Sequence, residues 1–99
     1  MNALENLRER LGSEVYLEVT GWRLYLRDVR TPPLADELAK TLAPLLTPTG
    51  IPELREVLTG IPITLGGGKS QVSLWECLPA ASVRNLERVL EQYAREWLD

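Results

Sequence analysis

The 99-residue chain contains no histidine and a single cysteine, Cys77. Histidine is the side chain most often used as a general base, as the group that activates a nucleophile, and as a zinc ligand. A lone cysteine cannot close an internal disulfide, and thiolate metal sites need several cysteines. We therefore expect a protein that is not an enzyme, that needs no cofactor or metal, and that keeps Cys77 as a buried structural thiol in the cytoplasm.

The chain also lacks a long apolar run and an excess of basic residues. Asn2, Glu5 and Arg8 interrupt the N-terminal leucines, so this segment has no apolar stretch as long as a signal peptide or a membrane span needs. The net charge of -3 argues against nucleic-acid binding, because affinity for phosphate backbones comes largely from lysine and arginine. With 44% hydrophobic and 25% charged residues, the chain is typical of one soluble globular domain over residues 1–99.

The strongest structural pattern predicts a β-hairpin over residues 14–27. A two-residue turn at Thr20 and Gly21 gives every cross-strand pair a chemical match. The apolar face pairs Val19 with Trp22, Leu17 with Leu24, and Val15 with Leu26. The other face pairs Glu18 with Arg23, Tyr16 with Tyr25, and Glu14 with Arg27. Because side chains alternate with a period of two, a shift by one residue would mix the two faces, so the register is strongly specified.

Helix signals flank this hairpin. Asn2 and Glu5 resemble a capping box, and the apolar stripe that follows stops at Gly12, which predicts a short first helix. After the hairpin, Thr31 is the expected N-cap of a second helix with Pro32 at its first position. That second helix is expected to break or kink near Pro44.

Two further helices are predicted in the second half. Residues 47–50 have turn composition and precede a brief helix over residues 52–59 that stops at Gly60. The closing helix begins after Pro79, with Ser82 as its N-cap, and its face of mixed charge is expected to be solvated. The acidic pairs at 36–37 and 53/56 lie at helix starts, where carboxylates stabilise the helix dipole, so we assign them no acid–base role.

A second hairpin is predicted between these helices. Residues 61–65 alternate between apolar and other side chains, and Pro62 confines this strand to an edge or a strand start. In the following strand Val72 and Leu74 share one face, and Trp75 is expected on the opposite, exposed face. An edge strand of this kind can pair with its copy, so a homo-oligomer is left open.

The order of elements, αββααββα, predicts a two-layer α+β domain in which two β-hairpins pack against helices. The apolar face of the first hairpin is expected to lie against the second and last helices. The predicted core residues are Val15, Leu17, Val19, Trp22, Leu24, Leu26, Leu38, Leu42, Leu86, Leu90 and Trp97.

The polar face of the first hairpin is the first candidate binding surface. Tyr16 and Tyr25 lie opposite each other there, flanked by Arg23 and Arg27, and amphipathic aromatic patches of this type anchor protein partners. The alternative is a cross-strand aromatic pair that only stabilises the sheet. Trp75 is expected to contribute to the same surface.

A glycine-rich loop is the second candidate. It consists of Gly66, Gly67, Gly68, Lys69 and Ser70. The last three match the end of a phosphate-binding loop, and the glycines offer backbone amides to an anion. However, Ile63 stands where that motif needs a glycine, and a strand rather than a helix is predicted after Ser70, so a plain hairpin connection is the alternative.

Three segments together resemble a family of small cyanobacterial proteins of unknown function. They are EVYLEV at residues 14–19, GWRLYLRD at residues 21–28 and LGGGK at residues 65–69. The resemblance covers nearly the whole chain and implies a photosynthetic bacterial host and an auxiliary role near photosynthetic or carbon-fixing machinery. It supplies no catalytic residue.

Residues and resemblance together favour a non-enzymatic protein-interaction module, an adaptor or assembly factor with an unidentified protein partner. The hypothesis that competes with it is a small-ligand or anion sensor that uses the loop at residues 66–70. Neither hypothesis requires nucleic acid or a membrane span.

Overall fold

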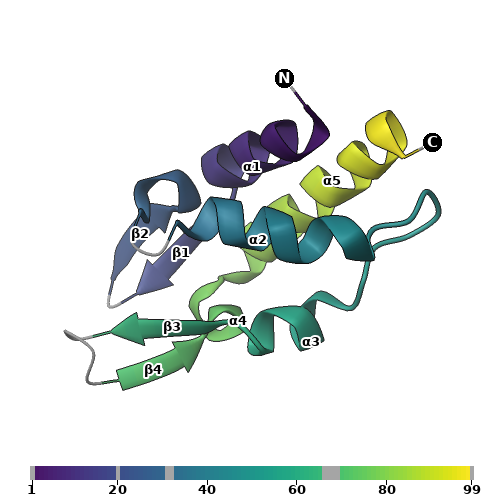
Figure 1. The fold of residues 1–99 in the computed structure, drawn as a ribbon. Helices are drawn as coiled ribbons and strands as arrows, with labels where there is room; N and C mark the ends of the chain where they lie inside the picture. The colour runs from purple at the N-terminus through teal and green to yellow at the C-terminus, as the bar shows by residue number, and fades with distance from the viewer. Residues whose placement is uncertain (1, 20, 31–32, 66–69, 99) are drawn as a thin grey trace.

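Five α-helices and two antiparallel hairpins alternate along residues 2–19, 21–30, 33–65 and 70–98, which the computed structural model describes (Figure 1). The first half contains α1 (Ala3–Glu14), β1 (Tyr16–Val19), β2 (Trp22–Tyr25), the 3₁₀ turn η1 (Leu26–Asp28), α2 (Leu34–Leu42) and the 3₁₀ turn η2 (Ala43–Leu45). The second half contains α3 (Leu54–Thr59), β3 (Pro62–Leu65), β4 (Ser70–Ser73), α4 (Leu74–Cys77) and α5 (Ala80–Trp97). The predicted α+β class is confirmed, and α4 is a helix that the sequence interpretation omitted.

The first hairpin has the predicted register. Strand pairing joins Tyr16 with Tyr25, Leu17 with Leu24, Glu18 with Arg23, and Val19 with Trp22. The next rung also holds, because the Leu26 N–H donates to the Val15 carbonyl oxygen over 3.0 Å. Gly21 has a φ of 84°, a left-handed conformation that glycine adopts without steric cost. Thr20, the other predicted turn residue, lies outside the described residues.

The predicted burial of the apolar hairpin face is wrong at the end nearest the turn. Leu17 is buried, but Trp22 is 72% exposed and Leu24 is 42% exposed. The helices cover the base of the hairpin, where Val15 and Leu26 are fully buried, whereas towards the turn only Val19 packs partly against the core among the described apolar residues of this face. Alternation of side chains sets which face a residue lies on, but not how far the covering layer extends.

Trp97 was also predicted to lie in the core, and it is 42% exposed. It is the last residue of α5, and its ring stacks on Tyr93 with centroids 6.4 Å apart. The ring therefore covers the edge of the core rather than filling it.

The start of α1 follows the prediction and its end does not. The Glu5 N–H donates to Asn2 Oδ1 over 2.8 Å, so Asn2 is the N-cap. Gly12 does not stop the helix, which continues to Glu14. Instead η1 passes so close that a Cβ on Gly12 would lie 3.0 Å from the Cβ of Arg27. Gly12 therefore permits a close approach between α1 and η1.

The middle helices agree with the sequence apart from their starts, since α3 begins at Leu54 rather than Pro52 and α2 also begins later than predicted. Helix α2 begins at Leu34 with Pro33 in the N-cap position, and the predicted cap at residues 31–32 lies outside the described residues. Its α-helical part ends at Leu42, and Pro44 sits in the 3₁₀ turn that follows. Thr47 and Gly50 form the predicted turn, and α3 ends at Gly60 as expected.

Both strands of the second hairpin are shorter than predicted: β3 begins at Pro62 rather than Ile61, and β4 ends at Ser73 rather than Trp75. Strands β3 and β4 pair from Pro62 with Ser73 to Leu65 with Ser70. Leu74 then begins α4, because Ser73 and Glu76 form a complete capping box, each side chain accepting from the other residue's backbone N–H. Trp75 consequently lies on a helix, and its predicted place on the outer face of a strand is wrong.

Ser82 is not the N-cap of α5, because that helix already begins at Ala80. Its hydroxyl is fully buried and bonds the backbone of β1 instead. The Tyr16 N–H donates to Ser82 Oγ over 2.9 Å, and the Ser82 hydroxyl donates to the Tyr16 carbonyl oxygen over 2.7 Å. One serine thus satisfies both backbone groups of a buried strand residue.

One contiguous core joins the helices to the base of the first hairpin. Its fully buried members include Leu7, Leu11, Val15, Leu26, Leu38, Leu42, Leu58, Leu74, Leu86, Val89 and Leu90. In Figure 1 both hairpins extend to the same side of the molecule, away from the two chain ends. The prediction that α2 and α5 supply core leucines is confirmed.

We expect Ser82→Ala to lower the free energy of unfolding by about 1–3 kcal/mol, because it leaves the buried N–H and carbonyl of Tyr16 without a partner. Urea unfolding followed by circular dichroism measures this loss. Ser13→Ala is the matched control, since Ser13 is exposed, and we expect it to change stability by less than about 0.5 kcal/mol. Equal effects of the two substitutions would contradict the bridging role of Ser82.

Candidate functional site

The structure brings together the two tyrosines and two arginines of the predicted binding surface. The rings of Tyr16 and Tyr25 lie with centroids 5.6 Å apart and planes tilted by 58°. The guanidinium carbon of Arg23 lies 4.6 Å from the Tyr16 ring centroid, and that of Arg27 lies 5.9 Å from the Tyr25 ring centroid. Both distances fall within the range of cation–π attraction.

Tyr16 is not available to a partner in the way that the sequence suggested. Only 8% of it is exposed, because the Arg23 side chain lies over its ring and α5 holds its backbone through Ser82. Tyr25 is half-buried, whereas Arg23 and Arg27 are exposed. The predicted solvent exposure of the tyrosine pair is therefore wrong for Tyr16, while the partner-binding role of this group stays a prediction.

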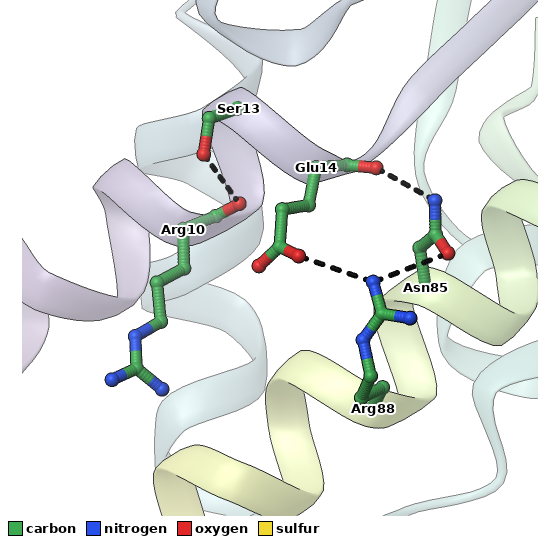
Figure 2. Close-up of polar contacts among 5 residues, drawn as sticks. All are labelled: Arg10, Ser13, Glu14, Asn85 and Arg88. Carbon is green, nitrogen blue, oxygen red and sulfur yellow. Dashed lines mark hydrogen bonds and ion pairs between the residues drawn. The ribbon is translucent and has the colours of Figure 1, made fainter.

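Neither predicted cross-strand ion pair forms among the described residues: Glu18 and Arg23 lie opposite each other without an ion pair between them, and Glu14 takes part in a contact between helices instead. Glu14 does not pair with Arg27; its Oε1 accepts from Arg88 of α5 over 3.1 Å (Figure 2). The Asn85 side-chain amide also donates to the Glu14 carbonyl oxygen over 3.1 Å. As a result Arg27 has no ion pair within the described residues, and neither has Arg30.

The prediction that the charged face of α5 is solvated is therefore only partly right, because part of this face contacts α1. Arg10 of α1 pairs with Glu96 over 2.7 Å, in addition to the pair between Glu14 and Arg88. Residue numbers rise along α1 as those of the partners fall along α5, so the two helices run antiparallel. Surface pairs of this type contribute little singly, but they fix which faces of the helices meet.

The hairpin tip is a candidate surface that sequence reasoning missed. Trp22 and Leu24 are exposed on the same face, next to a partly buried Val19. Exposed glutamate and arginine at positions 18 and 23 occupy the other face of the tip. Alternating apolar residues look the same in the sequence whether helices cover that face of the hairpin or leave it exposed. Neighbouring residues therefore could not reveal that Trp22 and Leu24 are exposed.

Trp75 makes no ring contact with Tyr16 or Tyr25 among the described residues. It is half-buried on α4 and lines a depression of about 530 Å³ together with Pro52, Leu54, Val83 and other residues of α3 and α5. Four residues of the glycine loop, Gly66, Gly67, Gly68 and Lys69, lie outside the described residues. Ser70 is the first residue of β4. An anion site in that loop stays a prediction.

Cys77 is a free and buried thiol, as the sequence indicated. Burial raises its pKa above the ordinary value of 9.0, and the negative charge of Glu76 adds to the effect. A thiol with a raised pKa stays protonated near neutral pH, which disfavours nucleophilic chemistry. Within the described residues, no three Cys, Asp and Glu side chains come together in a group that could hold a metal ion.

Comparison with known protein families gives a match that covers most of the chain. Residues 4–93 match the model of a family described as a protein of unknown function (DUF3181). The chain belongs to this family. The match spans both hairpins and nearly all of α5, and it confirms the resemblance to small proteins of unknown function that the sequence segments suggested.

One relative of this DUF3181 protein is named for its association with the thylakoid. The thylakoid-associated protein slr0729 of the cyanobacterium Synechocystis sp. is 29% identical over 92 residues, which cover 91% of this chain and 88% of that protein. No solved structure matches the chain. In the described part of the chain, none of the helices combines the length and apolar character needed to cross a bilayer.

We expect the stability advantage of the wild type over Cys77→Ala to shrink as pH rises above about 9. Below the unfolded-state pKa of 9.0 both states keep the thiol proton, so the contribution of the neutral thiol is fully present. Above it the unfolded chain ionises first, and the contribution is lost as pH rises through the higher folded pKa. Urea midpoints of both proteins between pH 8 and pH 10.5 test this, and a constant difference would contradict the raised pKa.

Proposed function

We propose that this chain is a non-enzymatic protein-interaction module, an auxiliary factor or adaptor that works near photosynthetic machinery. It is a cytoplasmic protein that associates peripherally with the thylakoid surface by docking on a protein there. The docking surface is the tip of the first hairpin, with Trp22 at its centre. The exposure of Trp22 is the observation that carries this proposal.

An indole that is 72% exposed is an unusual feature for a chain of this size. Trp22 and Leu24 together offer apolar surface on a hairpin whose base is held firmly by α5. Tryptophan is enriched among the residues that dominate binding energy at protein interfaces, and a rigid backbone lowers the ordering cost of binding. The tip is therefore suited to insert into a hollow on a partner.

The charge around the tip favours a protein partner over a lipid surface. Glu18 and Arg23 lie opposite each other beside the apolar residues, so the rim carries both signs. Mixed polar rims are typical of protein interfaces, whereas segments that bind anionic membranes concentrate lysine and arginine. The net charge of -3 also opposes adsorption to an anionic bilayer.

The thylakoid surface is chosen because a relative with 29% identity is named as thylakoid-associated. The proposal extends that location to the present chain and assigns the contact to residues of the first hairpin. Tyr25, Arg23 and Arg27 flank the tip and complete the surface, while the buried Tyr16 supports it from below.

We expect Trp22→Ser to reduce co-sedimentation with isolated thylakoid membranes at least about tenfold, the loss typical of an interface anchor. Trp97→Ser is the matched control, because Trp97 is also exposed but lies on α5. We expect it to bind like the wild type once circular dichroism shows that both variants are folded.

The nature of the partner is tested in the same assay. We expect binding to be lost on membranes treated with protease and on vesicles made from extracted thylakoid lipids. Wild-type binding by Trp22→Ser would rule out the hairpin tip as the docking surface. Full binding to lipid vesicles would rule out a protein partner.

A further inference from the structure

A groove of about 530 Å³ lies between α1 and the segment that follows β2, away from the apolar tip residues. Arg8 and Glu9 line it from α1, and Arg27 and Arg30 line it from the other side. Its size falls within the range of sites that hold small molecules. Arg27 is shared with the proposed docking surface, whereas Arg8, Arg30 and the other lining residues are not part of it.

The groove concentrates positive charge in an acidic protein. Three arginines and one glutamate line it, although the chain as a whole has a net charge of -3. Arg27 and Arg30 have no ion pair within the described residues, and Glu14, the predicted partner of Arg27, is engaged by Arg88. Arg8 is held loosely, at 3.8 Å from Asp36, and that carboxylate has a closer partner in Lys40 at 2.9 Å. Arg27 also lies 5.9 Å from the Tyr25 ring centroid, a contact that engages the face of the guanidinium and not its N–H donors. The N–H donors of these arginines can therefore bind an external anion.

The same groove also offers apolar surface. Val29, Pro33 and Ala35 contribute to its lining alongside the arginines. A bare inorganic ion would leave this surface in contact with water, whereas a ligand with an aliphatic part would cover it. The lining thus matches a molecule that has an acidic head and a short apolar body.

Gly12 explains how residues from two segments come to line one groove. It also lies in the lining, and a Cβ at this position would come within 3.0 Å of the Arg27 Cβ. The missing side chain lets η1 approach α1 closely, which brings Arg27 to the same groove as Arg8. Separate segments thereby supply a group of cations that no single helix or strand carries.

We propose that this groove binds a small amphiphilic anion, with a phosphate ester or sulfonate head held by Arg27, Arg30 and Arg8. The aliphatic part of the ligand lies against Val29, Pro33 and Ala35. Guanidinium groups suit this role because their planar donors bind phosphate and sulfonate oxygens in pairs.

Isothermal titration with octyl phosphate, below its micelle concentration, tests the proposal. We expect saturable binding by the wild type and at least tenfold weaker binding of octyl glucoside, which has the same chain and a neutral head. Inorganic phosphate, which has no chain, should also bind at least tenfold more weakly.

Variants distinguish binding in the groove from non-specific attraction of the anion to surface arginines. Arg27→Gln with Arg30→Gln should weaken octyl phosphate binding at least tenfold, while Arg84→Gln, an exposed arginine on α5, should leave it within twofold of the wild type. Ala35→Leu keeps every charge but fills part of the groove, and should abolish binding. Trp22→Ser should bind octyl phosphate normally, so failure of the hairpin proposal and failure of this one are distinguishable.

Vesicles with and without an anionic phospholipid identify the source of the head group. Vesicle binding that needs Arg30 assigns the groove to a lipid head group, and binding of octyl phosphate without vesicle binding assigns it to a soluble phosphate ester. The proposal is overturned if octyl phosphate does not bind at millimolar concentration. It is equally overturned if the folded Arg30→Gln and Ala35→Leu variants bind as the wild type does.

Discussion

The antiparallel contact between α1 and α5 is the interaction on which the rest of the structure depends. Leucines of both helices meet in the core, and polar pairs follow the edge of the contact from Arg10 with Glu96 to Glu14 with Arg88. Directly beyond the end of α1, Ser82 bonds both backbone groups of Tyr16 and continues the contact into β1. Because the first hairpin starts where α1 ends, its base is held against α5 and its direction is set by this contact.

Both candidate surfaces follow from that arrangement. Since α5 holds the hairpin only at its base, the tip with Trp22 and Leu24 extends beyond the helices and stays exposed. Since Arg88 of α5 takes the carboxylate of Glu14, Arg27 loses its expected partner and lines the groove beside α1. One contact between two helices therefore leaves an apolar surface at one end of the hairpin and, at the other end, an arginine that has no ion pair within the described residues.

Most of the local structure could be read from neighbouring residues. The hairpin register, the cap at Asn2, the break at Pro44 and the stop at Gly60 all depend on side chains within a few positions of each other. The start of α4 was also readable, because Ser73 and Glu76 have the spacing of a capping box, but the preceding alternation led to a strand being extended through Trp75. Gly12 and Ser82 were misread as helix-end residues because both types are common there, while their actual partners lie elsewhere in the chain.

The sequence by itself determined the α+β class, the register of the first hairpin and the approximate positions of every helix except α4, because these follow from alternation, periodicity and capping over short distances. Tertiary structure alone decided which parts of the amphipathic faces are covered, that Glu14 binds Arg88, and that Ser82 serves β1. The partners in these contacts are separated by 74 and 66 positions, and only packing of the whole chain brings them together. Burial and charge pairing thus depend on the packing of the whole core, because the neighbours of a residue in the sequence do not specify which distant segment packs against it.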